Sequence, residues 1–204
     1  MLKSRLCIAF FAFAVGCAPA QKPLTDYVNP MLGTATLWDS VDLGFKPTKR
    51  TWGAEVFPGS SLPNAMVQVS PVTKFHSGAG YQYEDSVIYG FTHTNKGHWN
   101  LCHIPLLPVT GTPTPGDYCS PFSHERESAA PGYYQVFLDR YGVDAQLSST
   151  LRCAFHKYTY PAGAAASLLA DLQRSNEHVR AWDIRKEGDN VFAGWQQTGE
   201  KMYF

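Results

Sequence analysis

The stretch Tyr134–Leu147, YQVFLDRYGVDAQL, decides the fold class of this chain. Two runs within it, Tyr134–Leu138 and Val143–Leu147, alternate apolar and polar residues with the period of two that a half-buried β-strand shows. Tyr141-Gly142 lies between them, and a short link between two alternating runs is typical of a β-hairpin. The stretch therefore predicts two antiparallel strands joined by a tight turn.

Similar short runs continue on both sides of this hairpin. They are Ala65–Ser70 before it, and Leu151–Tyr160, Ser167–Leu172, Ala181–Ile184, Val191–Trp195 and Lys201–Phe204 after it. Turns rich in glycine and proline separate many of them, and no stretch indicates a long helix. Consecutive short strands at this spacing predict an all-β chain folded as an antiparallel β-sandwich.

Alternation also predicts which side chains share a face of a strand. In Leu151–Tyr160 one face is expected to carry Arg152, Ala154, His156 and Tyr158. Trp182 and Trp195 lie in alternating strands and are expected in the core.

Composition limits the partners of the chain. Its 204 residues suffice for one large domain or two small ones, and its 17 Lys and Arg balance its 17 Asp and Glu. Because no basic run is present, no electrostatic argument favours a nucleic-acid partner.

The first 20 residues have the features of an export signal. Lys3 and Arg5 form a charged start, and Leu6–Val15 is an apolar core too short to span a membrane as a mature helix. Cleavage after Ala20 leaves 21–204 as a β-sandwich domain, whereas Ala14–Cys17 resembles a bacterial lipobox in which Cys17 is lipidated and attaches the protein to a membrane. Either alternative predicts a protein exported from a bacterial cell, periplasmic or held as a lipoprotein at the outer membrane or cell surface.

Three cysteines lie beyond this signal, namely Cys102, Cys119 and Cys153. An odd number in an exported chain permits at most one disulfide and a free thiol. The fold is therefore expected to depend on its core rather than on a disulfide framework.

The stretch Phe91–Val109, FTHTNKGHWNLCHIPLLPV, holds the candidate binding residues. Four of them are predicted to bind substrate: His93, His98, Trp99 and Asn100. No other segment places so many polar side chains beside an indole, and loops on a rigid scaffold commonly carry function. The alternatives are a buried structural histidine at 93 and a rim aromatic at 99. The His and Cys spacing matches no strong zinc pattern.

Five segments in order resemble family 92 of the glycoside hydrolases, the exo-acting α-mannosidases. They are Val28–Thr34 (VNPMLGT), Phe57–Ser60 (FPGS) with Leu62–Pro71 (LPNAMVQVSP), Gly90–Thr94 (GFTHT), Ser123–Glu127 (SHERE) with Pro131–Val136 (PGYYQV), and Thr150–Arg152 (TLR). Each segment alone is weak, but their order is specific.

This resemblance implies an N-terminal β-sandwich followed by a C-terminal (α/α)6 barrel. It implies a calcium-dependent enzyme that inverts the anomeric centre, with the catalytic carboxylates and the calcium ligands supplied by the barrel. Lys201–Phe204 has the pattern of a strand that is cut before its end, so we expect this chain to be a fragment. Such a fragment would contribute residues to the substrate cleft but would not cleave the substrate by itself.

The chain departs from the family pattern after Thr94, where many members have a small glycine-rich turn. Here Trp99 is expected to stack on a pyranose ring, and His98 and Asn100 to hydrogen-bond hydroxyl groups. The expected substrate is an α-mannoside glycan without an assigned linkage. The alternatives are a stand-alone carbohydrate-binding module, which predicts mannoside binding by the isolated domain, and a structural surface lipoprotein.

Overall fold

A computed structural model describes residues 21–36, 55–96, 99–199 and 201–204. The export signal, with its lipobox at Cys17, lies outside the described residues. Two short 3-10 helices, η1 (Leu24–Tyr27) and η2 (His124–Arg126), accompany many short strands. In the described part of the chain, no helix has the length and apolarity needed to cross a membrane.

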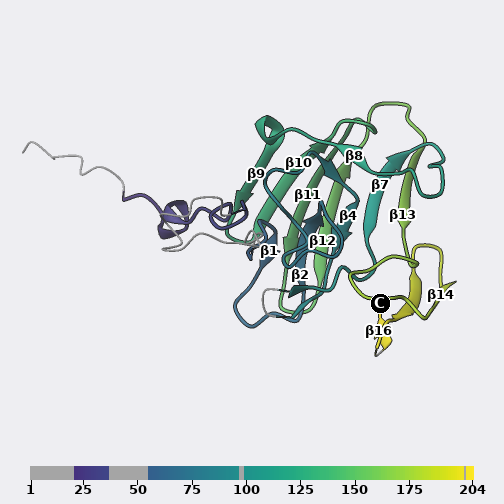
Figure 1. The fold of residues 1–204 in the computed structure, drawn as a ribbon. Coiled ribbons are helices and arrows are strands. Elements are labelled where there is room, and N and C mark those ends of the chain that lie inside the picture. Colours follow the sequence, from purple (N-terminus) through teal and green to yellow (C-terminus); the bar gives the residue numbers. More distant parts are fainter. Residues whose placement is uncertain (1–20, 37–54, 97–98, 200) are drawn as a thin grey trace, which may run out of the picture.

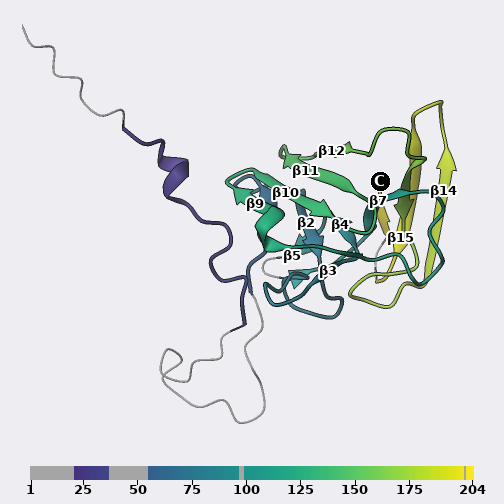
Figure 2. The ribbon, with the colours of Figure 1, turned by 90° about the horizontal axis from the view of Figure 1, so that it is seen from above.

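Two antiparallel sheets form the body of the domain (Figure 1). The five-stranded sheet has the order β1 (Ser60–Ser61), β2 (Gln68–Val72), β4 (Gly90–Thr92), β7 (Leu106–Thr110) and β13 (Ala166–Ala170). The four-stranded sheet has the order β12 (Ala154–Thr159), β11 (Val143–Ser149), β10 (Tyr133–Leu138) and β9 (Glu127–Ala130). Figure 2 shows these sheets as two layers, which confirms the predicted all-β antiparallel sandwich.

Three smaller sheets complete the structure. A three-stranded sheet contains β14 (Ala181–Lys186), β15 (Phe192–Gln197) and β16 (Lys201–Tyr203) and lies beside β7 and β13. The two-stranded ribbons are β3 (Val87–Ile88) with β8 (Ser120–Pro121), and β5 (Asn95–Lys96) with β6 (Trp99–Asn100).

The hairpin predicted from Tyr134–Leu147 is present as β10 and β11. Gln135 pairs with Gln146 and Val136 with Ala145, and Gly142 adopts a left-handed φ of 65° in the turn. Buried and half-buried residues alternate along both strands. One face of the hairpin therefore points into the sandwich.

The core is formed by the inward faces of both sheets. Its buried members are Val69, Tyr81, Ile88, Phe91, Leu107, Val109, Tyr118, Phe122, Tyr134, Val136, Leu138, Tyr141, Val143, Ala145 and Leu147. Gly59 marks a close backbone approach at the start of β1, because a Cβ atom there would lie 2.0 Å from the carbonyl oxygen of Val69. Ala154, His156 and Tyr158 share the more buried face of β12, as alternation predicted, whereas Arg152 lies before the strand and is exposed.

The prediction that Trp182 and Trp195 are core residues is wrong. Trp182 is 43% exposed, and the half-buried ring of Trp195 lies under the ammonium group of Lys201. Gln196 is fully buried instead, and its amide donates to the carbonyl oxygen of Leu172 at 2.9 Å. The three-stranded sheet meets the sandwich through this polar side chain, so an alternating strand here does not place its indoles inside.

We expect Leu147→Ala to lower the free energy of unfolding by about 2–5 kcal/mol, because it opens a cavity in a packed core. Leu147 is 1% exposed, whereas Phe155 on the neighbouring strand is 62% exposed. Phe155→Ala is the control and should change stability by about 0.5 kcal/mol or less. Urea unfolding followed by tryptophan fluorescence measures both, and equal losses would contradict the assigned inward face of β11.

Candidate functional site

The candidate residues lie in the segment that leaves β4 and returns as β7. Near its end the chain makes a tight turn in which Cys102 and Ile104 both have a φ of 51°. A left-handed backbone is costly for a residue with a Cβ, and most costly for a β-branched residue such as isoleucine. The surrounding structure must therefore hold this turn in place.

Hydrogen bonds from distant parts of the chain supply that constraint. The amide N–H of Ile104 donates to Oε1 of Gln196 at 3.1 Å, and the amide N–H of Asn176 donates to the carbonyl oxygen of Leu101 at 3.1 Å. His103 is buried between the hydroxyl groups of Thr94 and Thr198, and burial lowers its pKa. The turn is thus attached to β15 and to the segment that precedes β14.

Asn100 occupies the centre of this turn and is 1% exposed. Its Oδ1 accepts from the amide N–H of Cys102 at 2.8 Å and from the hydroxyl of Thr92 at 3.2 Å. Gly80 lies against the amide group, where a Cβ atom would come within 2.6 Å of Nδ2. These contacts give Asn100 a structural role, and its predicted contact with a sugar hydroxyl stays a prediction.

Trp99 precedes Asn100 and points the other way. It lies on β6, paired with Lys96 of β5, and its side chain is 51% exposed. Alternation along the two-residue strand accounts for the contrast, since adjacent residues face opposite sides. His98, the remaining member of the predicted set, lies outside the described residues.

His93 is half-buried just after β4 and contacts the opposite sheet. Its Nε2 lies 2.8 Å from Nε2 of His156, and Nδ1 of His156 lies 2.6 Å from the hydroxyl of Tyr158. Burial lowers the pKa of His93 to about 4. Burial and the neighbouring His93 lower the pKa of His156 to about 3. Both imidazoles are therefore neutral at pH 7.

Sequence reasoning placed His156 and Tyr158 on one face but assigned them no role. The predicted shared face was the available signal, although alternation alone did not say which face of the strand points to the sheet that carries His93. His156 contacts His93, which lies 63 positions away in the sequence. Alternation along a single strand cannot predict a contact at that separation.

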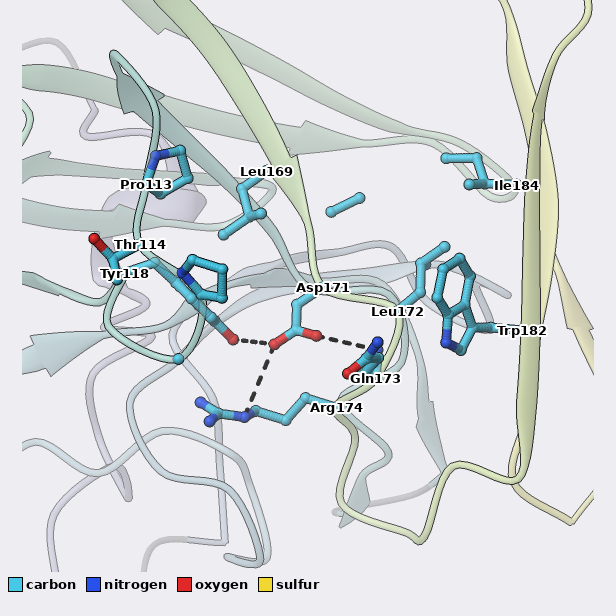
Figure 3. Close-up of a pocket in the computed structure, with 13 residues that line it drawn as sticks. Pro113, Thr114, Tyr118, Leu169, Asp171, Leu172, Gln173, Arg174, Trp182 and Ile184 are labelled. Carbon is cyan, nitrogen blue, oxygen red and sulfur yellow. Dashed lines mark hydrogen bonds and ion pairs between the residues drawn. The ribbon is translucent and has the colours of Figure 1, made fainter.

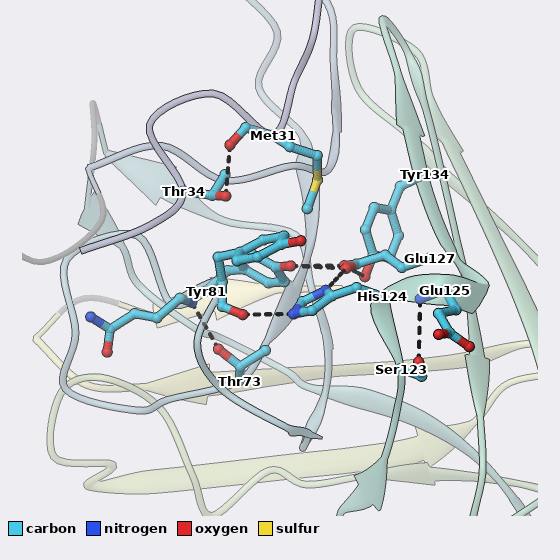
Figure 4. A network of polar contacts seen from close by, with 11 residues as sticks. Met31, Thr34, Thr73, Tyr81, Ser123, His124, Glu125, Glu127 and Tyr134 are labelled. Atoms are coloured by element: carbon cyan, nitrogen blue, oxygen red, sulfur yellow. Dashed lines mark hydrogen bonds and ion pairs between the residues drawn. The ribbon is translucent and has the colours of Figure 1, made fainter. Parts of the chain in front are cut away.

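A second polar cluster surrounds Glu127 (Figure 4). Its carboxylate accepts from the hydroxyl groups of Tyr81 and Tyr134 and lies 2.5 Å from Nδ1 of His124. The His124 ring stacks on Tyr83 with centroids 3.9 Å apart. This cluster joins η2 to the sandwich, so His124 and Glu127 have a structural role there.

A groove of about 550 Å³ lies between the end of β13 and the three-stranded sheet. Figure 3 shows Trp182 and Ile184 on one side of it, facing Leu169 and Leu172. Asp171 at its floor accepts a hydrogen bond from the Tyr118 hydroxyl. The groove is separate from the loop that carries Trp99.

The described residues offer little for a metal ion. In the ranges that the structure describes, no three His, Cys, Asp or Glu side chains gather closely enough to hold one. Calcium takes six to eight oxygen ligands, with carboxylates prominent among them, and those ranges bring no such group of carboxylates together. Cys102, Cys119 and Cys153 are free thiols, with Cys102 buried.

The fold and the loop define the class of this protein: an antiparallel β-sandwich domain that presents an exposed indole on a rigidly held turn. Residues 27–204 match the glycosyl hydrolase family 92 N-terminal domain. The chain therefore belongs to this family, as the sequence segments predicted. Comparison with curated proteins gives no match.

Solved structures of this family have the same fold. The family 92 α-mannosidase BT3965 from Bacteroides thetaiotaomicron, in complex with mannoimidazole, matches with a TM-score of 0.73 and 29% identity, over 86% of this chain and 23% of its own. The family 92 inverting mannosidase BT2199 from Bacteroides thetaiotaomicron VPI-5482 matches with a TM-score of 0.66 and 25% identity, over 88% of this chain and 24% of its own. The present chain thus spans about a quarter of the length of these relatives.

The buried histidine pair predicts a pH dependence of stability. Between about pH 6.5 and pH 4 the unfolded chain takes up protons on imidazoles that stay neutral in the folded protein, so the unfolded state binds more protons. Each pKa unit is worth about 1.4 kcal/mol per histidine, so we expect the free energy of unfolding to fall by about 3–6 kcal/mol as the pH falls through this window.

Urea unfolding at a series of pH values measures this loss. His93→Asn combined with His156→Gln is the comparison variant, since it removes both titrating groups and keeps polar side chains. The decrease should be smaller in that variant. An identical decrease in both proteins would mean that the pair does not titrate as described.

Proposed function

We propose that this chain is the N-terminal sandwich of an exported exo-α-mannosidase and forms one wall of its substrate cleft. The observation that carries the proposal is the position of Trp99, half-exposed on a turn that distant parts of the chain hold in place. The printed activities of the structural relatives, α-mannosidase and inverting mannosidase, give the substrate class. An α-mannoside glycan is thus the proposed ligand.

The indole suits this ligand on physical grounds. A pyranose presents axial C–H groups that form an apolar face, and an aromatic ring buries that face at little cost in conformational entropy. Polar groups beside the ring then orient the hydroxyl groups. Trp99 supplies the apolar surface, and His93 and His98 are the proposed polar neighbours.

Catalysis is assigned to residues outside this chain. An inverting glycosidase uses a general acid and a general base about 6.5–9.5 Å apart, so that a water molecule fits between them. We propose that a C-terminal (α/α)6 barrel supplies both carboxylates and the ligands of a calcium ion. In that barrel, calcium would supply positive charge that attracts the oxygen atoms of the sugar. The sandwich would exclude water from the cleft and position the sugar ring.

The remaining features belong to the same proposal. The N-terminal signal directs export from a bacterial cell. Cleavage after Ala20 then releases the protein, whereas cleavage before Cys17 followed by lipidation of that cysteine attaches it to a membrane. The second candidate function is a stand-alone carbohydrate-binding module. The exposure of Trp99 favours it, because the indole is already presented without a partner domain.

Trp99→Ala is expected to weaken α-mannoside binding about fivefold, the effect of losing about 1 kcal/mol of stacking. In the protein that joins this domain to its catalytic domain, the same change should raise KM or lower kcat. Trp182→Ala is the matched control, since that tryptophan is also about half-exposed but lies on the separate groove. Equal effects of the two variants would show that Trp99 is not part of the binding site.

The 204-residue chain alone, purified and supplied with calcium, is expected to release no product from an aryl α-mannoside above the uncatalysed rate. A full-length family relative serves as the positive control of the assay. Robust calcium-dependent turnover would place the acid and the base within the present residues. Calorimetric titration of the same sample with methyl α-mannoside tests the binding-module alternative.

A further inference from the structure

Three side chains form a continuous line of polar contacts across the sandwich. The line runs from the hydroxyl of Tyr158 to Nδ1 of His156 at 2.6 Å, and from Nε2 of His156 to Nε2 of His93 at 2.8 Å. His156 and Tyr158 lie two residues apart on β12 and share its inward face. Phe91 contacts both of their rings from the opposite sheet. The three groups are therefore positioned by both layers of the domain.

Each contact in this line needs one donor and one acceptor. A neutral imidazole carries a single N–H, so its two nitrogens have opposite roles. Burial lowers the pKa of His93 to about 4, so at pH 7 both contacts form between neutral groups. Only two arrangements of the protons satisfy both contacts, and they run in opposite directions.

In the first arrangement Tyr158 donates to Nδ1 of His156, and the Nε2–H of His156 donates to Nε2 of His93. The proton of His93 is then on Nδ1. In the second arrangement every donor and acceptor is reversed, so the phenolic proton of Tyr158 requires another acceptor.

The surroundings of the two ends decide between these arrangements. The Tyr158 hydroxyl makes no other hydrogen bond with the described residues, and burial raises the pKa of Tyr158 strongly. A phenolic proton without an acceptor in such a site is unfavourable. The second arrangement therefore leaves a buried donor unpaired.

The other end of the line is Nδ1 of His93. Among the described residues, the buried side-chain nitrogen and oxygen atoms without a partner are Gln68 Oε1 and Asn100 Nδ2. Nδ1 of His93 makes no hydrogen bond to another described residue, and it is not one of these unpartnered buried atoms. The first arrangement therefore adds no buried unpaired group to those two.

We propose that Tyr158 and His156 are positioning residues that hold His93 in its neutral Nδ1–H tautomer, so that His93 can only donate a hydrogen bond at Nδ1. Because His93 is a substrate-binding residue in the proposed function, the acceptor would be a hydroxyl oxygen of the glycan. This last step rests on the proposed function, whereas the tautomer does not.

Two-bond proton–nitrogen correlation spectra of the ¹⁵N-histidine-labelled 204-residue chain at pH 7 test the relay without any ligand. Assignment uses His93→Asn and His156→Gln samples. We expect opposite tautomers, with Nδ1–H on His93 and Nε2–H on His156. An Nε2–H tautomer at His93, or the same tautomer at both residues, would overturn the proposal.

Tyr158→Phe removes the hydroxyl that sets the direction of the line. It should change the His93 signals from one tautomer to a mixture of two. Tyr160→Phe is the control, because that hydroxyl donates to the carbonyl oxygen of Ser167 and takes no part in the line. An unchanged His93 spectrum in Tyr158→Phe, with the fold retained by circular dichroism, would also overturn the relay.

Replacement of His93 separates the relay from the sugar contact. Asparagine places its amide N–H near the position of Nδ1, and glutamine places it near Nε2. Methyl α-mannoside binding should therefore be retained better by His93→Asn than by His93→Gln, by about fivefold for one hydrogen bond. The reverse order would overturn the donor assignment. No binding by any protein, combined with the expected tautomers, would overturn the proposed function and leave the relay standing.

Discussion

Packing between the inward faces of β10 and β11 and the five-stranded sheet is the constraint on which the rest of the structure depends. Tyr134, Val136 and Leu147 are enclosed there, and burial of apolar surface is the main favourable contribution to folding. The candidate loop, the three-stranded sheet and the cluster around Glu127 all attach to strands of this core. These three parts can hold a fixed geometry only because the core strands to which they attach are themselves rigid.

Prediction from sequence succeeded where one face of a strand meets a large apolar core. The alternation in Tyr134–Leu147 predicted the hairpin, and the same pattern placed His156 and Tyr158 on one face of their strand. It failed at Trp182 and Trp195, because the three-stranded sheet meets the sandwich through the amide of Gln196 rather than through apolar side chains. Hydrophobic periodicity carries no information about such a polar contact.

The candidate site likewise combines features that the local sequence predicted with features that distant contacts determine. Residue types near position 99 singled out the loop as the candidate site, because no other segment of the sequence places so many polar side chains beside an indole. The groups that shape the loop, Gln196 and Asn176, lie 92 and 76 residues from their partners in it. Local spacing cannot indicate contacts of that range, nor could it distinguish the exposed Trp99 from the enclosed Asn100 beside it.

The loop is attached to the rest of the domain at both of its ends. His93 contacts His156 just after β4. Leu101, His103 and Ile104 bond to Asn176, Thr198 and Gln196 shortly before β7. A substitution at either attachment would therefore disturb the scaffold together with the loop, so the shape of this loop and the packing of the two sheets are inherited as one unit.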